Sequence, residues 1–105
     1  MQAKPLTHCY ILVRTDIPPA YQAVQSAHAA IKAARSGLLS CDDNPSLVVC
    51  GVPDQKALLD ASARLCIHAV PHALFYEDDV DSFTALCTAD LEKPQRRILR
   101  DFKLL

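Results

Sequence analysis

Glycine is scarce in this sequence, since Gly37 and Gly51 are the only two among 105 residues. A loop that binds phosphate through its backbone needs several clustered glycines, which two separated glycines cannot supply. Long apolar runs are also missing, because no stretch approaches the roughly 20 residues that cross a bilayer, and no signal peptide is recognisable. We therefore expect neither a glycine-rich nucleotide site nor a membrane partner.

An excess of one charge is equally absent. The formal net charge is −1, and the sequence pI is about 6.4. Proteins that bind nucleic acids or anionic membranes through their overall field carry a marked positive excess. Any contact with such a partner must therefore depend on a local group of basic side chains.

The cysteines form an odd set without a C-x-x-C pair, namely Cys9, Cys41, Cys50, Cys66 and Cys87. This pattern predicts a reduced, cytoplasmic protein rather than a disulfide framework. Cys9, Cys50 and Cys87 fall within apolar runs, where cysteine usually behaves as a small buried side chain. We expect these three in the core, and not as nucleophiles or metal ligands.

Hydrophobic patterning predicts a single domain over residues 1–105. Strands are predicted over about 8–14, 46–52, 72–76 and 82–88, and helices over about 19–35, 53–68 and 91–100. The first strand is apolar on both faces and should lie in the middle of the sheet. The short acidic turn near residues 77–81 predicts an antiparallel hairpin, and residues 101–105 can dock as a short strand or an ordered end. The expected fold class is α/β, a three-layer α/β/α sandwich with a mixed four-stranded sheet.

The first strand and the first helix meet at the most informative stretch of the chain. An apolar stripe that should face the core is formed by Ala20, Val24, Ala27 and Ile31. A polar stripe at its edge is formed by Tyr21, Gln25, His28 and Lys32. Thr15 and Asp16 should cap the helix or interact with its positive end. We expect the function to lie at this junction.

Evidence for a metal site is weak. The four histidines, at positions 8, 28, 68 and 72, lack the spacing of zinc ligands. The acidic turn lacks the glycine and the spaced ligands of a calcium loop, so we interpret it as solvated, with Mg²⁺ the fitting ion if one binds. We expect no metal and no other cofactor. A carboxylate at a strand end is well placed to act as a general base, which makes Glu77 or Asp78 a candidate.

The last predicted helix is the most basic part of the chain, with Lys93, Arg96, Arg97 and Arg100. Basic side chains late in a helix complement its dipole, so one interpretation is a solvated surface helix. Contact with an RNA backbone is the other interpretation.

Two segments of the junction carry a family resemblance, Arg14-Thr15-Asp16-Ile17 and Gln25-Ser26-Ala27-His28-Ala29. They resemble the second structural class of peptidyl-tRNA hydrolases, the archaeal and eukaryotic type. Within that class the resemblance is closest to the branch of small proteins described as peptidyl-tRNA hydrolase domain-containing. The resemblance covers about residues 8–105 as an ordered pattern. Two features differ. Tyr21 stands where the family has a lysine, and the family's Asp-Ala-Gly-Arg-Thr-Gln-Ile segment is shortened to Glu77-Asp78-Asp79-Val80.

The resemblance implies a homodimer that hydrolyses the ester between a peptide and the terminal ribose of tRNA, without a covalent intermediate. Glu77 would orient or deprotonate water, and Gln25 and His28 would position the substrate or stabilise the oxyanion, with Tyr21 at the lysine position. Contacts to tRNA and its 3′ end would come from Lys32, Arg35, Arg96, Arg97 and Arg100.

The loss of the lysine leaves other readings open. Replacing a charged stabiliser by a neutral hydroxyl costs on the order of 10²–10³ in rate. One alternative is therefore a catalytically impaired family member that acts as an RNA-binding or regulatory dimeric module. Another is a small-molecule regulatory domain that uses the same pocket.

Overall fold

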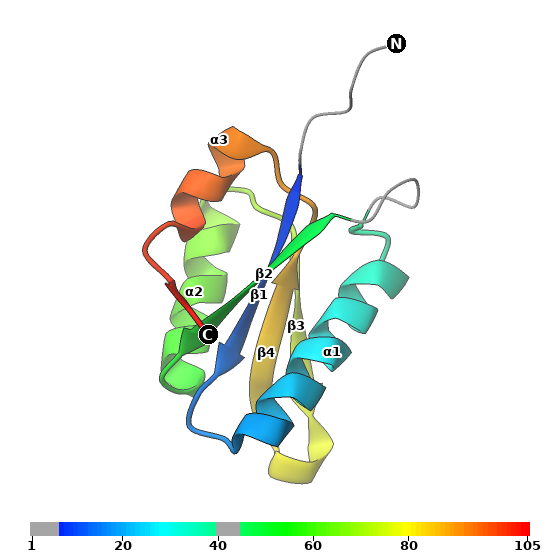
Figure 1. The fold of residues 1–105 in the computed structure, drawn as a ribbon, viewed down its shortest axis with the longest axis vertical. Coiled ribbons are helices and arrows are strands. Elements are labelled where there is room, and N and C mark those ends of the chain that lie inside the picture. The colour runs from blue at the N-terminus through cyan, green and yellow to red at the C-terminus, as the bar shows by residue number, and fades with distance from the viewer. Residues whose placement is uncertain (1–6, 40–44) are drawn as a thin grey trace.

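The computed structural model describes residues 7–39 and 45–105 and shows a mixed α/β fold (Figure 1). Its elements in chain order are β1 (His8–Arg14), α1 (Pro19–Arg35), β2 (Ser46–Val52), α2 (Gln55–Ile67), β3 (His72–Glu77), the 3₁₀ turn η1 (Asp78–Val80), β4 (Ser82–Thr88), α3 (Lys93–Arg96), the 3₁₀ turn η2 (Arg97–Leu99) and β5 (Lys103–Leu104). Residues 1–6 and 40–44, which include Cys41, fall outside the described residues.

The sheet is mixed and has the strand order β3-β4-β1-β2-β5. β1 pairs in parallel with β2, and the other neighbouring strands are antiparallel. β1 lies in the middle, as predicted, because its side chains from Cys9 to Val13 are buried on both faces. The predicted count of four strands is wrong. The fifth strand, β5, has only two residues and pairs with Cys50 and Gly51 of β2, so the tail over 101–105 docks as a short strand, one of its two expected arrangements.

Successive side chains of β1 point to opposite faces of the sheet and join two separate cores. One core contains Cys9, Ile11 and Val13 together with Ala29 and Ala33 of α1. The other contains Tyr10, Leu12 and Cys50 together with Leu58 and Leu65 of α2. Figure 1 accordingly shows α1 on one side of the sheet and α2 with α3 on the other. The predicted burial of Cys9, Cys50 and Cys87 is confirmed.

Helix α1 buries a different face from the predicted one. Its buried residues are Gln25, Ser26, Ala29 and Ala33. Val24 and Ile31, which were expected in the core, are 45% and 54% exposed. Small side chains on the buried face let the helix lie close to β3 and β4, and this close packing leaves the larger apolar residues at the edge.

Thr15 and Asp16 do not cap α1, which was one of the two roles expected for them. Its first turn follows Pro18 and has no side-chain cap. Asp16 instead accepts two 2.8 Å hydrogen bonds from Arg14, and Thr15 Oγ1 donates to the carbonyl of Val52 at 3.2 Å. Proline at the first helical positions makes a cap less necessary, because its missing N–H is one that would have no helical partner.

The helices on the other face begin at clear local signals. Asp54 caps α2 by accepting the backbone N–H of Ala57 at 2.8 Å. Glu92 and Gln95 form a capping box at α3. The predicted helix over 91–100 is nevertheless interrupted, since four α-helical residues are followed by the tighter η2, which carries Leu99 into the core at 1% exposure. Among the described residues, no helix is both long enough and apolar enough to span a membrane.

Candidate functional site

A carboxylate and an amide meet where α1 crosses the end of β3. Gln25 Nε2 donates a 2.8 Å hydrogen bond to Oε1 of Glu77, the last residue of β3. Gln25 Oε1 accepts a 2.5 Å hydrogen bond from the hydroxyl of Thr84. Gln25 and Thr84 are fully buried, whereas Glu77 is partly exposed. Because an ionised carboxylate only accepts hydrogen bonds, the amide orientation of Gln25 is fixed between its two partners.

Thr84 reaches this position through a β-bulge. Phe75 pairs with Ala85, but the next residue of β3, Tyr76, pairs with Phe83, so Thr84 is the extra residue of β4. A bulge re-aims side chains that strict alternation would place on the other face. Thr84 thereby contacts Gln25 on α1, although Leu86, two residues later, packs in the core on the α2 side.

Arg14 fixes the start of β4 beside the bulge. Its Nη1 donates to Ser82 Oγ at 2.9 Å and to the carbonyl oxygen of Phe83 at 3.1 Å. Asp16 holds the other edge of the same guanidinium. The hydrogen bonds to Asp16 and its negative charge raise the pKa of Arg14. The same hydrogen bonds and the positive charge of Arg14 lower the pKa of Asp16. The end of β1 therefore positions the strand that carries Thr84.

Glu77 is held in its ionised form by its neighbours. The hydrogen bond from Gln25 is the largest effect that lowers the pKa of Glu77. The backbone N–H of Asp79, the Tyr21 hydroxyl and the positive charge of His28 lower this pKa further, and burial opposes them. The carboxylate is thus an acceptor that can orient water at neutral pH, although its low pKa makes it a weaker base.

Tyr21 lies one helical turn before Gln25 and faces the same carboxylate. Partial burial raises the pKa of the Tyr21 phenol, and the nearby negative charge of Glu77 raises it further. The hydroxyl therefore stays protonated at neutral pH and acts as a hydrogen-bond donor.

His28 stands on the outer side of this group. Its ring stacks on Phe75 of β3 with ring centroids 4.7 Å apart and an angle of 7° between the planes. The side chain of His28 is exposed, so stacking holds the plane of the ring while its edge faces solvent. In this position an imidazole nitrogen can donate to, or accept from, a molecule bound beside Glu77.

A recess of about 330 Å³ continues from His28 along α1. Its lining includes Phe75 and the basic side chains of Lys32 and Arg35. The ammonium of Lys32 donates to the carbonyl oxygen of Leu74 at 2.6 Å, which anchors it over β3. Two of the predicted tRNA-binding residues therefore lie next to the predicted catalytic residues.

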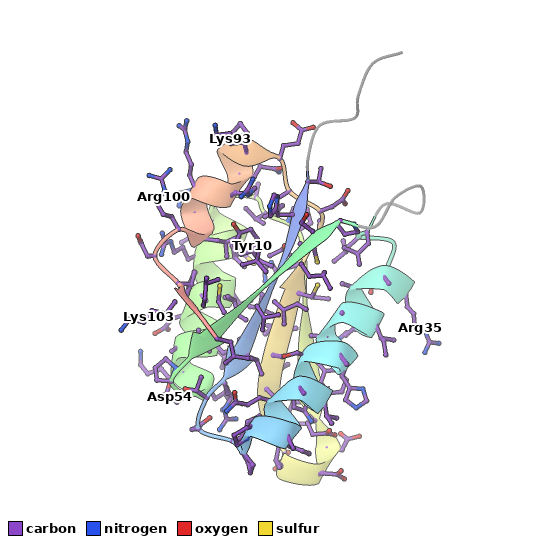
Figure 2. The ribbon with its side chains drawn as sticks, viewed as in Figure 1. Tyr10, Arg35, Asp54, Lys93, Arg100 and Lys103 are labelled. Atoms are coloured by element: carbon purple, nitrogen blue, oxygen red, sulfur yellow. The ribbon has the colours of Figure 1, made fainter. Side chains whose placement is uncertain are left out.

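The other three predicted tRNA-binding residues do not belong to this site. Arg96, Arg97 and Arg100 line a second recess with Tyr10 and Lys93. Tyr10 belongs to the core on the α2 side of the sheet. In Figure 2, Lys93 and Arg100 lie near α3, on the opposite side of the molecule from Arg35. The five residues predicted as one tRNA-binding set are divided between two faces.

No group of three or more metal-ligating side chains occurs within residues 7–39 and 45–105. In the acidic turn, Asp81 accepts a hydrogen bond from the hydroxyl of Tyr76. His72 contacts Ser62 Oγ at 2.7 Å and the carbonyl oxygen of Val70 at 2.9 Å. Asp81 and His72 are therefore both engaged in hydrogen bonds within the protein.

Sequence reasoning missed two residues of the site, Thr84 and Phe75. Both come from the β3–β4 hairpin and meet α1 only after the chain folds. Thr84 gave a weak signal, because it is a polar residue inside an otherwise apolar strand. Phe75 gave none, since an aromatic residue in a strand is ordinary core composition.

The comparisons with known proteins show the fold alone. No protein-family model matches the chain, and no curated protein matches it. Among solved structures it is similar to Atu0240, a protein of unknown function from Agrobacterium tumefaciens, with a TM-score of 0.67 and 14% sequence identity. The match covers 94% of this chain and 97% of that chain, so the arrangement of elements is shared from end to end.

Proposed function

We propose that this protein hydrolyses the ester bond of peptidyl-tRNA, or of a related N-acyl-aminoacyl-tRNA, and releases the peptide and the tRNA. The observation that carries the proposal is the hydrogen bond from buried Gln25 to partly exposed Glu77, with His28 beside it. Tyr21, Gln25 and His28 of α1 all act on this carboxylate, which lies 52 residues after Gln25 in the chain. The α/β/α sandwich, the cytoplasmic location and the homodimer of that family are part of the same proposal.

In the proposed reaction, Glu77 orients a water molecule for attack on the ester carbonyl. Its lowered pKa suits an ionised acceptor that aligns the water and takes its proton as the bond to carbon forms. The electron pair of the carbonyl moves to oxygen, and His28, whose ring edge faces solvent, is placed to stabilise that oxyanion or to protonate the leaving ribose oxygen. The intermediate then collapses: the carbonyl re-forms, the bond between the carbonyl carbon and the ribose oxygen breaks, and the proton taken from water is returned to that oxygen, which leaves a free carboxyl group and a tRNA with a free terminal hydroxyl.

Gln25 has a narrower role than the resemblance implied. Its carbonyl is used by Thr84 and its amide by Glu77, and the side chain is fully buried. It therefore acts as a positioning residue for Glu77 rather than as a direct contact to the substrate. Lys32 and Arg35 line the recess next to His28, where a phosphate near the 3′ end of tRNA would bind.

The rival function is an RNA-binding or regulatory module that has lost catalysis. The observation in its favour is Tyr21, which faces Glu77 with a neutral hydroxyl where the family has a charged amine. A neutral donor stabilises a developing negative charge less strongly than an ammonium. In this case tRNA would bind with a strong dependence on salt concentration and would not be hydrolysed.

The test is the release of N-acetyl amino acid from N-acetyl-aminoacyl-tRNA by the wild-type protein and by Glu77→Gln. Asp60→Asn is the matched control, since it also changes a carboxylate to an amide, but on the exposed surface of α2. Turnover that falls about 100-fold or more in Glu77→Gln and persists in Asp60→Asn supports the proposal. Equal turnover by both variants would contradict it.

A further inference from the structure

The second recess is a small pocket with a strong concentration of positive charge. Four cationic side chains and one hydroxyl form its walls, and we call it the basic pocket: Tyr10, Lys93, Arg96, Arg97 and Arg100. Its volume is about 290 Å³. A water molecule occupies about 30 Å³ in the liquid, so the pocket has room for a phosphoryl group and part of the molecule that carries it.

The four cations converge because of their spacing. Lys93, Arg96, Arg97 and Arg100 follow the pattern i, i+3, i+4 and i+7, which places side chains on one face of a helix. The short α3 and the η2 turn after it continue in the same direction, and buried Leu99 holds the opposite side against the core. The basic side chains therefore stand together instead of spreading around the chain.

The nearest acids in the chain are occupied elsewhere. The Glu92 side chain accepts the N-terminal backbone N–H of its own helix in the capping box. Asp101 pairs with Arg64 of α2 at 3.4 Å. In the described parts of the chain, none of the four cations of the basic pocket forms an ion pair with a carboxylate. Among residues 7–39 and 45–105, four positive charges thus stand together without a paired carboxylate, in a protein whose formal net charge is −1.

Tyr10 adds a neutral donor at the inner side of the pocket. It is 9% exposed and lies on the central strand β1. Arg96 Nε donates to its oxygen at 3.4 Å, so that oxygen is an acceptor and the phenolic hydrogen can be donated to a further group. Several cationic donors around one hydroxyl match an oxyanion with three or more acceptor oxygens and about two negative charges.

We propose that the basic pocket binds a phosphoryl group, supplied either by a small phosphorylated molecule or by the phosphate backbone of a nucleic acid. Arginine forks bind phosphate oxygens in pairs, and the pocket offers three of them with a lysine. The pocket lies on the opposite side of the sheet from Glu77, so this inference does not depend on the proposed hydrolysis.

The first experiment titrates isotope-labelled protein with inorganic phosphate at constant ionic strength and follows the backbone amides by NMR. Saturable shifts confined to residues 9–11 and 93–100 are expected. Arg97→Gln should weaken binding about tenfold, and Tyr10→Phe should weaken it about threefold or more while keeping the ring. Lys56→Gln is the matched control, because it removes the same charge from an exposed side chain at the start of α2, outside the lining of the basic pocket.

The second experiment separates the two sources of the phosphoryl group. Adenosine monophosphate and a single-stranded RNA without terminal phosphates are titrated against the same amides. Shifts with the nucleotide identify a small ligand, and shifts with the RNA identify backbone phosphates. Either result supports the proposal. No ester is hydrolysed in this assay, so a negative result leaves the proposed reaction untouched.

Three results would overturn the proposal. The first is an absence of saturable shifts with phosphate. The second is equal weakening by Lys56→Gln and Arg97→Gln, which would show only a general effect of net charge. The third is binding of inorganic phosphate without binding of the nucleotide or the RNA, which would indicate an adventitious ion only.

Discussion

Gln25 of α1 donates a 2.8 Å hydrogen bond to Glu77 at the end of β3, 52 residues later in the chain. Gln25 is inaccessible to solvent, whereas Glu77 reaches the surface. A fully buried amide therefore sets the position of an exposed carboxylate. Gln25 thus links Thr84 to Glu77 through two hydrogen bonds. Substitution of Thr84 tests the stability of this chain of hydrogen bonds, and substitution of Glu77 tests its function.

Thr84→Val should destabilise the protein by about 1–3 kcal/mol, because it leaves the buried carbonyl of Gln25 without a donor while keeping the volume of the side chain. Urea unfolding measures this change. Thr15→Val is the matched control. The Thr15 hydroxyl is on an exposed residue, so its loss should cost less than about 1 kcal/mol. Equal costs for the two variants would show that the hydrogen bond to Gln25 adds no stability.

The contribution of Glu77 to stability should depend on pH. Hydrogen bonding by Gln25 lowers the pKa of Glu77 below its usual value of 4.5, so the folded protein binds fewer protons than the unfolded chain in this region. The stabilisation is present above pH 4.5 and is lost as the pH falls through the lower, folded-state pKa. The difference in urea midpoint between wild type and Glu77→Gln should therefore shrink on acidification. A difference that is constant over this range would be inconsistent with a lowered pKa.

Tyr21 should titrate later than an ordinary tyrosine. Partial burial and the negative charge of Glu77 both raise the pKa of its phenol. Tyr21→Phe should remove the late step from an ultraviolet titration of tyrosinate. Glu77→Gln should move this step to lower pH, because it removes a charge that opposes ionisation. If the step does not move, Tyr21 and Glu77 do not interact.

The stacking of His28 on Phe75 should hold the plane of the imidazole ring without supplying chemistry. Phe75→Leu keeps an apolar side chain but removes the ring face, so the His28 ring protons should move downfield in the NMR spectrum. His68, an exposed histidine after α2, is an internal control whose signals should stay in place. Hydrolysis should fall several-fold with Phe75→Leu. Unchanged His28 signals would mean that the two rings do not stack in solution.

Much of the fold could be predicted from local patterns. The continuous apolar runs of β1, β2 and β4 and the long helix α1 have the predicted bounds, because each is long enough to show its period and ends at a strong breaker such as Pro18 or Gly37. β5 is different. For residues 101–105 the sequence left a short strand and an ordered end open, and pairing with β2 selects a strand of two residues.

The buried face of α1 could not be predicted from hydrophobicity. The helix is rich in alanine, so its apolar and polar sides differ little, and Val24 and Ile31 gave the strongest but misleading signal. Tertiary contacts decide which face of α1 is buried. Gln25 can be buried because Thr84 and Glu77 form hydrogen bonds with its amide group. The bulge that brings Thr84 to the helix depends on the register of β3 and β4, which the sequence of neither strand specifies alone.

Release of N-acetyl amino acid from N-acetyl-aminoacyl-tRNA by wild type, His28→Ala and Tyr21→Lys tests the proposed hydrolysis at the residues around Glu77. We expect turnover by the wild-type protein, loss of most of that turnover in His28→Ala, and faster turnover in Tyr21→Lys, where an ammonium faces Glu77. Circular dichroism must show that all three proteins are folded. Folded wild-type and Tyr21→Lys proteins that both bind tRNA without releasing any amino acid would contradict the claim and leave RNA binding as the function of this fold.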